Sequence, residues 1–310
     1  MSVATRLART WRTLLGAEVP AAPAPPAPNG VTGPDDPFLA WVPPGHFYSI
    51  VPGPDDVARA KARYAGAGPT LPGIALKPGQ LVPGFQERAA LVSDWDGGFA
   101  AGGRYHARNQ AFDVGDAAML RASILLHRPR RLIEVGSGWS SACTLDTLDE
   151  AGIDTSVTFI EPYPENLEAR LRPADKARVD IRVAEVQSVP TEVFAELDAN
   201  DILFIDSSHV FKPGSDVDDY FGRILPSLRP GVHVHIHDIF WPFEVPAGWL
   251  DEGRAWNEGH ALRNFLANSD SWEITVFNDY FKRFHLDVIE ASLPLVLENP
   301  GGSIWLRRTA

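Results

Sequence analysis

The sequence is poor in cysteine. Its single cysteine, Cys143, cannot form a disulfide within the chain, which excludes a small disulfide-stapled scaffold. A chain without disulfides is typical of a reducing compartment, and we therefore predict a cytoplasmic protein. The sequence also has no run near the roughly 20 apolar residues that a membrane-spanning helix needs, so no transmembrane segment is expected.

Basic residues are scarcer than acidic ones. The 310 residues include 28 Lys and Arg against 40 Asp and Glu, a formal net charge of −12. A general affinity for nucleic acid or for anionic lipid is therefore not expected. Hydrophobic residues make up 45% and charged residues 22% of the chain, a composition typical of a globular protein with a large core.

The composition divides the chain into three parts. Residues 1–37 join a basic tail, with arginines at helical spacing, to the run "PAAPAPPAP", whose prolines favour an extended linker. These arginines interrupt the apolar segment that a secretory signal would need. Residues 38–115 are rich in proline, glycine and aromatics, which indicates an irregular N-terminal cap. Residues 116–310 form the predicted core.

The core alternates between strand and helix patterns. Strand-like runs lie at 131–135, 157–161, 179–184, 201–206 and 231–238, and helical runs at 140–151, 164–172, 190–197 and 216–228. A further helix precedes them, with Asp116 as its predicted cap. The runs 272–278 and 303–308 close the chain as two strands expected to pair antiparallel. This order predicts an α/β fold with a doubly wound, mostly parallel, seven-stranded Rossmann-like sheet.

Polar residues follow the predicted strands where those strands end. Glu134 and the loop Gly136-Ser137-Gly138 belong to the first strand, and Glu161 ends the second. Carboxyl ends of parallel strands meet at one edge of a sheet, where ligands of α/β proteins bind. Glycines let the loop backbone approach a ligand, although a tight turn accounts for them equally well. A complete dinucleotide motif would need glycine at position 141, which is a serine.

These motifs carry a resemblance to a known family. "LIEVGSGWSS" with "FIEP" resembles the first two motifs of class I S-adenosylmethionine-dependent methyltransferases. "ANDILFIDSSHVFKPGSDV" and "GVHVHIHDIFWPFEVP" are similar to a bacterial branch of that superfamily associated with small molecules and glycans. The resemblance extends from about residue 41 to the end of the chain. It implies that S-adenosylmethionine is the cofactor, bound by Glu134, Gly136, Ser137, Gly138 and Glu161.

Two later strand ends supply the candidate catalytic groups. Asp206 and His209 follow the fourth strand, and His237 and Asp238 end the fifth. His209 beside a carboxylate is a candidate general base, with capping of its own loop as the alternative. Some relatives bind a divalent cation at these strand ends, so the resemblance allows magnesium on Asp206 and Asp238 with His209. Hydrogen bonding to adenine or substrate would use the same carboxylates.

The predicted function is methyl transfer from S-adenosylmethionine to a small-molecule acceptor, a hydroxyl of a sugar or secondary metabolite. Asn109, Trp256, Asn257 and Glu258 are candidate walls of the acceptor pocket, with loop packing as the alternative. Two other functions stay open at this point. One is a metal-dependent, hydroxylase-like enzyme on the same fold, and the other is a non-catalytic module that binds a ligand and a partner protein. A homo-oligomer is also left open.

Three histidines alternate along the run "GVHVHIHD". Side chains two apart on a strand share a face, so His233, His235 and His237 point the same way. The outer two are about 13 Å apart at a rise of about 3.3 Å per residue, too far for one metal ion. We therefore predict that His233 and His235 hydrogen-bond beneath a helix layer, whereas His237 belongs with the site.

Overall fold

The computed structural model describes residues 42–100 and 102–310, which leaves the predicted tail and linker at 1–37 outside the described residues. The chain divides into two compact units, Met1–Val51 and Pro52–Ala310. In the first unit, the amide of Gly45 donates to the carbonyl of Val51 at 2.9 Å, which closes a loop. On this loop, the rings of His46 and Phe47 stack with their centroids 4.2 Å apart, and the side chain of Phe47 is exposed.

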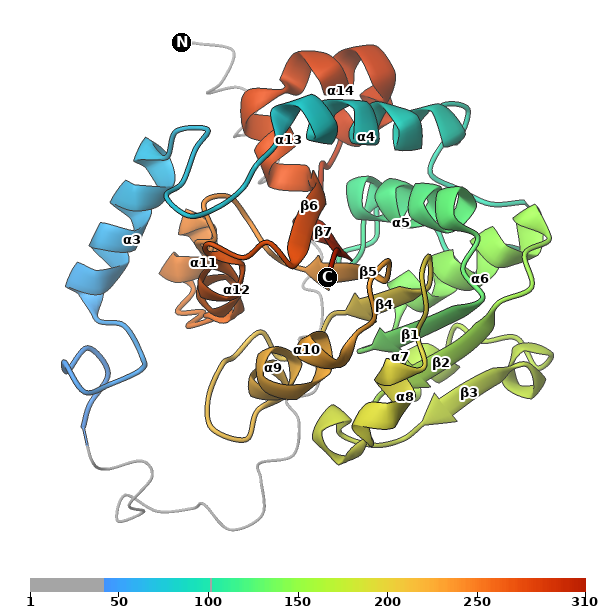
Figure 1. Ribbon diagram of the computed structural model, residues 1–310, viewed down its shortest axis with the longest axis horizontal. Coiled ribbons are helices and arrows are strands. Elements are labelled where there is room, and N and C mark those ends of the chain that lie inside the picture. The colour runs from blue at the N-terminus through green and yellow to red at the C-terminus, as the bar shows by residue number, and fades with distance from the viewer. Residues whose placement is uncertain (1–41, 101) are drawn as a thin grey trace, which may run out of the picture. The chain divides into compact units, whose positions relative to one another are not determined.

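A seven-stranded sheet forms the centre of the second unit, in the order β3-β2-β1-β4-β5-β7-β6 (Figure 1). The strands are β1 (Arg131–Val135), β2 (Ser156–Ile160), β3 (Val179–Arg182), β4 (Ile202–Ile205), β5 (His233–His237), β6 (Trp272–Phe277) and β7 (Ser303–Arg308). The first five strands are parallel, and β7 pairs antiparallel with both β5 and β6. The predicted doubly wound, mostly parallel sheet is therefore confirmed.

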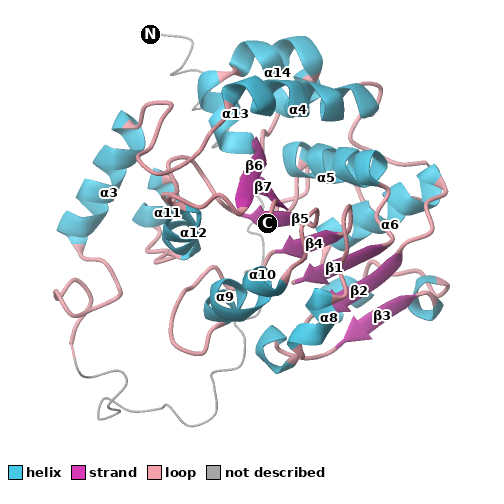
Figure 2. Ribbon diagram, in the orientation of Figure 1, coloured by secondary structure: helices cyan, strands magenta, loops and turns pink. Residues whose placement is uncertain are grey.

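Helices cover both faces of this sheet (Figure 2). On one face lie α4 (Pro78–Leu91), α5 (Val114–His127) and α6 (Trp139–Ala151), and on the other lie α8 (Thr191–Ala195), α9 (Asp216–Asp219), α10 (Leu225–Ser227) and α12 (Glu258–Leu266). The remaining helices are α3 (Pro54–Gly66), α7 (Glu165–Glu168), α11 (Ala247–Asp251), α13 (Asn278–Phe284) and α14 (Leu286–Ser292). Within the described residues, none of the helices has the length and apolarity to cross a membrane.

The start of the core differs from the prediction. Residues 54–115 belong to the same compact unit as the sheet, and α4 within them packs against α5 and β6. Helix α5 begins after Asp113, whose carboxylate accepts from the amide of Val114 at 2.7 Å. Asp116 is not the cap. It is buried and accepts a hydrogen bond from the hydroxyl of Ser303 at 2.6 Å, because β7 begins beside the first turn of α5.

The alternating histidines of β5 stack on other rings. His235 lies against Phe204 of β4 with ring centroids 4.1 Å apart, and both of its ring nitrogens lack hydrogen-bond partners. His233 stacks on His127 of α5 at 3.6 Å. The predicted hydrogen bonds of these two histidines are therefore wrong for His235 and for Nδ1 of His233. Burial lowers the pKa of His233 to about 2 and the pKa of His235 well below its ordinary value.

Candidate active site

A first cavity opens at the edge of the sheet where the parallel strands end. Its volume is about 580 Å³, within the usual size of small-molecule sites. The residues that line it follow β1, β2, β3 and β4, and they include Gly136, Ser137, Glu161, Gln187, Asp206 and Asp216. The structure thus brings together at this cavity several of the residues predicted to bind the cofactor.

Gly136 occupies a position that only glycine tolerates. Its φ is +78°, and a Cβ built on it would lie 1.5 Å from the carbonyl oxygen of Asp206. Strands β1 and β4 are direct neighbours, so the chain leaving β1 must pass closely over the end of β4. The glycine is therefore required by this chain crossing, whether or not a ligand also approaches the loop.

Glu134 lies behind the loop and does not line the cavity. Its side chain is fully buried in β1, and one carboxyl oxygen accepts hydrogen bonds from the hydroxyls of Ser140 at 2.6 Å and Ser141 at 2.8 Å. Burial raises the pKa of Glu134 to about 8, although the two hydroxyls oppose that shift. Glu134 thus holds the first turn of α6, and its part in binding a cofactor stays a prediction.

Glu161 faces the cavity from the end of β2. Its carboxylate accepts from the backbone amide of Ser137 at 3.1 Å and from that of Tyr163 at 2.9 Å. These two bonds hold the side chain beside the glycine loop. Asp206 lines the same cavity from the end of β4. Burial alone would raise the pKa of Asp206, but the neighbouring His237 and His209 outweigh it and lower the pKa to about 2.

His209 lies among three carboxylates. Its Nε2 is 3.3 Å from Asp206 and 3.8 Å from Asp238, and its Nδ1 is 2.9 Å from Glu258. Burial lowers the pKa of His209, but the hydrogen bonds to Asp206 and Glu258 outweigh it and raise the pKa well above the ordinary value. The raised pKa favours the protonated form of the His209 ring.

A second cavity, of about 310 Å³, opens beside the end of β5. His237 and Asp238 line it, together with Tyr64, Asn109, Gln110, Asp113, Asp116, Phe240, Trp249, Asp279, Lys282 and Asn299. Burial raises the pKa of Asp238 above its ordinary value. Burial would lower the pKa of His237, but the charges of Asp238, Asp206 and Asp116 outweigh it and raise the pKa to about 9.

Several lining groups of the second cavity were not predicted. Phe240 and Trp249, whose rings meet edge to face at 5.2 Å, come from the chain that follows β5, and Lys282 comes from α13. Asn109 was predicted as a wall of the acceptor pocket, and it does line this cavity. Trp256 and Glu258 line neither of these two cavities and contact His209 instead.

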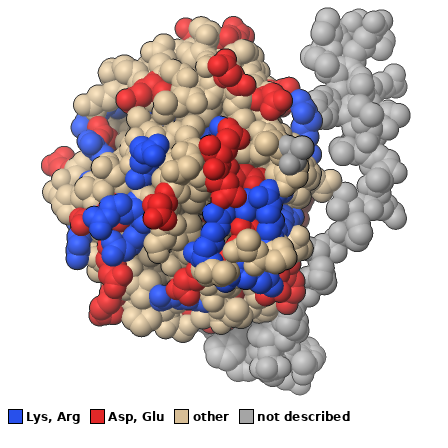
Figure 3. Space-filling model, turned by 90° about the vertical axis from the view of Figure 1, so that its right-hand side faces the viewer, with Lys and Arg blue, Asp and Glu red and all other residues tan. Residues whose placement is uncertain are grey.

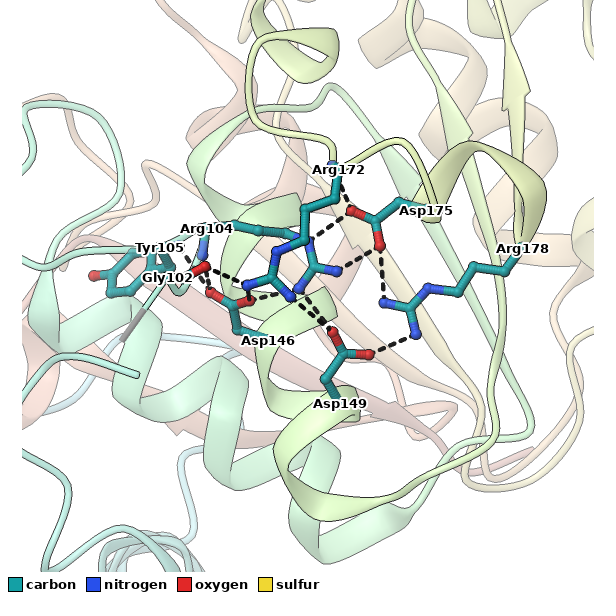
Figure 4. A network of polar contacts seen from close by, with 8 residues as sticks. All are labelled: Gly102, Arg104, Tyr105, Asp146, Asp149, Arg172, Asp175 and Arg178. Carbon is teal, nitrogen blue, oxygen red and sulfur yellow. Dashed lines mark hydrogen bonds and ion pairs between the residues drawn. The ribbon is translucent and has the colours of Figure 1, made fainter. Parts of the chain in front are cut away.

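A buried arginine fixes the segment that carries Asn109. The guanidinium of Arg104 donates to Asp146 at 2.5 Å, to Asp149 at 2.8 Å and to Asp175 at 2.7 Å (Figure 4). The backbone amides of residues 104 and 105 also donate to Asp146. These contacts tie the segment to α6 and to the chain before β3. Figure 3 shows acidic and basic side chains side by side on the face of the molecule nearest β3.

Across residues 42–100 and 102–310, no three His, Cys, Asp or Glu side chains are arranged to hold a metal ion. A divalent cation on Asp206 and Asp238 stays a prediction. His209 lies within 4 Å of each of these two carboxylates.

Comparison with known proteins gives one family match. Residues 133–239 match the model of a family described as a methyltransferase domain. This stretch holds the glycine loop, Glu161, Asp206, His209 and Asp238. The match confirms the resemblance to methyltransferases for these residues, whereas the bacterial branch stays a prediction.

The individual proteins that are similar to this chain share less than 30% of its residues. An uncharacterized protein of Archaeoglobus fulgidus is 29% identical over 131 residues, which are 40% of this chain and 59% of that protein. The chain thus spans about three fifths of the length of that relative. The solved structure of the O-methyltransferase TomG from Streptomyces achromogenes, described as in complex with SAM, is 17% identical, with a TM-score of 0.43 over 76% of this chain and 92% of that chain. The SAH-bound methyltransferase PaMTH1 of Podospora anserina is 16% identical, with a TM-score of 0.41 over 84% of this chain and 99% of that chain.

Proposed function

We propose that this protein, whose residues 133–239 form a class I methyltransferase domain, transfers a methyl group to a hydroxyl of a small molecule. In this proposal S-adenosylmethionine occupies the first cavity and the acceptor occupies the second. The observation that carries the proposal is the arrangement of the two cavities. Asp206 lines one and Asp238 lines the other, and Nε2 of His209 lies within 4 Å of both carboxylates.

The residues of the first cavity fit the cofactor. The carboxylate of Glu161 can accept hydrogen bonds from the two vicinal hydroxyls of a ribose, and Gly136 and Ser137 line the cavity beside it. Asp206 is ionised in this setting, which suits a cationic ligand. When bound, S-adenosylmethionine supplies a methyl group on a positively charged sulfur.

The second cavity fits an acceptor with several hydroxyl groups. Asp113, Asp238 and Asp279 offer carboxylate oxygens that accept hydrogen bonds from hydroxyls, and Phe240 and Trp249 offer apolar ring faces. A sugar or a polyhydroxylated metabolite combines both properties. Lys282 and the protonated ring of His237 add positive charge to this acidic lining.

Asp238 is the base in this proposal, in place of His209. Its raised pKa and its position in the second cavity allow it to take the proton of the acceptor hydroxyl as that oxygen gains the methyl group. His209 already directs both ring nitrogens at carboxylates and contributes a fixed positive charge between them. The sequence alone could not make this distinction, because Glu258 comes from another part of the chain.

Calorimetry with S-adenosylmethionine and S-adenosylhomocysteine tests the cofactor assignment. Glu161→Ala should weaken binding of both by about 10- to 100-fold, because it removes hydrogen bonds to a charged group. Glu196→Ala, an exposed residue of the chain after α8 that lines neither cavity, is the matched control and should bind like the wild type. If neither ligand gives heat or a thermal shift with the wild-type protein, the proposed function is wrong.

Transfer of a tritiated methyl group tests the acceptor assignment. The acceptors are methyl α-D-glucoside, methyl α-L-rhamnoside and catechol, with ethylamine as a probe for transfer to nitrogen. Label in a polyol, lost in Asp238→Asn, is the expected result. Label in ethylamine alone would contradict transfer to oxygen.

A further inference from the structure

His209 adopts a backbone conformation that few residues other than glycine adopt. Its φ is +59°, in the left-handed region, and its side chain is only 7% exposed. A residue persists in this conformation when its surroundings hold it there. The surroundings in question are three consecutive residues, Trp256, Asn257 and Glu258, which lie where the chain enters α12.

Two of these three residues hold the His209 loop through hydrogen bonds to its backbone. The carbonyl of His209 accepts from the amides of Asn257 at 3.1 Å and Glu258 at 3.2 Å. The side-chain amide of Asn257 accepts from the backbone amide of Phe211 at 2.6 Å and donates to its carbonyl at 3.1 Å. The loop after β4 is therefore fixed on both sides of the histidine.

The same residues also fix the imidazole ring. Trp256 lies against it with ring centroids 4.4 Å apart, and Glu258 faces Nδ1 at 2.9 Å. With Nδ1 held by Glu258, the opposite nitrogen, Nε2, is turned toward Asp206 and Asp238. The charged groups that face His209 are thus Glu258 from α12, Asp206 after β4 and Asp238 after β5.

The one side-chain hydrogen bond that Glu258 makes within the described residues is the one with His209. The side chain of Glu258 is 2% exposed, lines neither large cavity, and leaves its second oxygen without a hydrogen-bond partner. An unsatisfied buried carboxylate oxygen is costly, which argues that the contact with His209 is what keeps a glutamate at this position.

We propose that Glu258 is a positioning residue, which holds the imidazole of His209 between the carboxylate of the cofactor cavity and the carboxylate of the acceptor cavity. The catalytic part of this inference rests on the proposed function. In the fixed arrangement each ring nitrogen donates to a carboxylate, and neither Asp206 nor Asp238 can move without losing its contact with the ring. The relation of the two cavities is thereby set from α12, outside both.

The test is the spectrum of the histidine side chains in the full chain labelled with ¹⁵N at histidine. His209→Asn identifies the His209 signal among those of the nine histidines. In the wild type we expect Nδ1 of His209 to carry the proton that it donates to Glu258 across 2.9 Å. Glu258→Gln keeps the shape of the side chain but removes its charge, and it should displace or remove this Nδ1–H signal. Glu258→Asp restores the charge but shortens the side chain, so the signal should be present but displaced from its wild-type position.

Glu244→Gln is the matched control. Glu244 is also a buried glutamate that faces a histidine, His260, at 3.1 Å, but it does not contact His209. It should lower the thermal midpoint to a similar extent and leave the His209 signal unchanged. An unchanged His209 signal in folded Glu258→Gln, or an equal change in Glu244→Gln, overturns the inference. If Glu258→Gln does not fold, Glu258→Asp decides, because a displaced His209 signal is then expected and an unmoved one refutes the positioning.

The spectra need no methyl acceptor and no bound cofactor. Absence of cofactor binding in the wild type would therefore refute the proposed function, and the fixed orientation of His209 could still be tested. Conversely, normal cofactor binding together with an unaltered His209 signal in Glu258→Gln would refute only the positioning role of Glu258.

Discussion

Arg104 provides the strongest test of how the segment beside the acceptor cavity is held. The side chains of Arg104, Asp146 and Asp175 are 3%, 3% and 2% exposed, so Arg104→Ala leaves two buried carboxylates without their common partner. Loss of one partner from a buried ion pair costs about 3–5 kcal/mol of unfolding free energy. For a domain of this size that is a fall in thermal midpoint on the order of 10 °C.

The same network offers a matched control for this prediction. Arg178 contacts Asp149 at 2.5 Å and Asp175 at 3.2 Å, but its side chain is 43% exposed. Arg178→Ala should cost only about 0.2–1 kcal/mol, because solvent screens an exposed pair. Arg104→Lys should fall between the two, since an ammonium keeps the charge but cannot donate to both buried carboxylates as the planar guanidinium does.

Urea unfolding of the three variants, followed by circular dichroism, measures these differences. Cofactor affinity should stay within about twofold of the wild type, because Arg104 lines neither cavity and a tenfold change would need about 1.4 kcal/mol. The reasoning is refuted if Arg104→Ala unfolds at the same urea concentration as Arg178→Ala. In that case the buried network would contribute no more than a surface pair.

Two further predictions concern the base and the buried histidines. Asp238→Asn should slow methyl transfer by about 100-fold or more while leaving the calorimetric Kd for S-adenosylmethionine unchanged; equal loss of both would place Asp238 in the cofactor site. Burial lowers the pKa of His127 to about 3 and that of His233 to about 2, below the unfolded value near 6.5. The unfolded chain thus binds more protons below pH 6.5. The unfolding free energy should therefore fall as the pH is lowered below 6.5, by up to about 1.4 kcal/mol per pH unit for each histidine. Replacing both histidines with leucine should make the urea midpoint depend less on pH between pH 7 and pH 5. An unchanged dependence would contradict the assignment of both histidines as buried neutral groups.

The strands of the core were predictable because each is a short apolar run between polar loops. The strand predicted at 201–206 is observed at Ile202–Ile205, and the one at 157–161 at Ser156–Ile160. Parallel order then fixes which edge the following residues occupy. This is why Asp206 and Asp238 could be assigned to one edge without any knowledge of their contacts.

Helix α4 could not be recognised from its local preferences. It contains Pro83 and Gly84, which disfavour a helix interior. Its buried residues Leu81, Phe85 and Ala89 nevertheless follow one another at intervals of four, the spacing of one helix face. Packing of this face against α5 and β6 outweighs the poor propensity, and the interval of four is a signal in the sequence that could have found the helix.

The partners of His209 were beyond sequence reasoning for a different reason. Glu258 is 49 residues further along the chain, and its contact with His209 depends on how α12 packs beside the loop after β4. The sequence gives a histidine next to a carboxylate, which suits a base. Only the fold shows that this histidine has carboxylates on both sides, which suits a fixed charge instead.

The histidines of β5 also show that the fold, and not the residue type, decides the charge of a side chain. His233, His235 and His237 share one face, yet the pKa of His233 falls to about 2 and the pKa of His237 rises to about 9. All three are buried, so burial favours the neutral ring in each. The difference arises because Asp116, Asp206 and Asp238 gather at the carboxyl edge of the sheet, where their charges act on His237, whereas His233 lies beside Arg88 and His127. One residue type thus has opposite charge states along one strand, and the strand end at which carboxylates collect is the end at which the two cavities open.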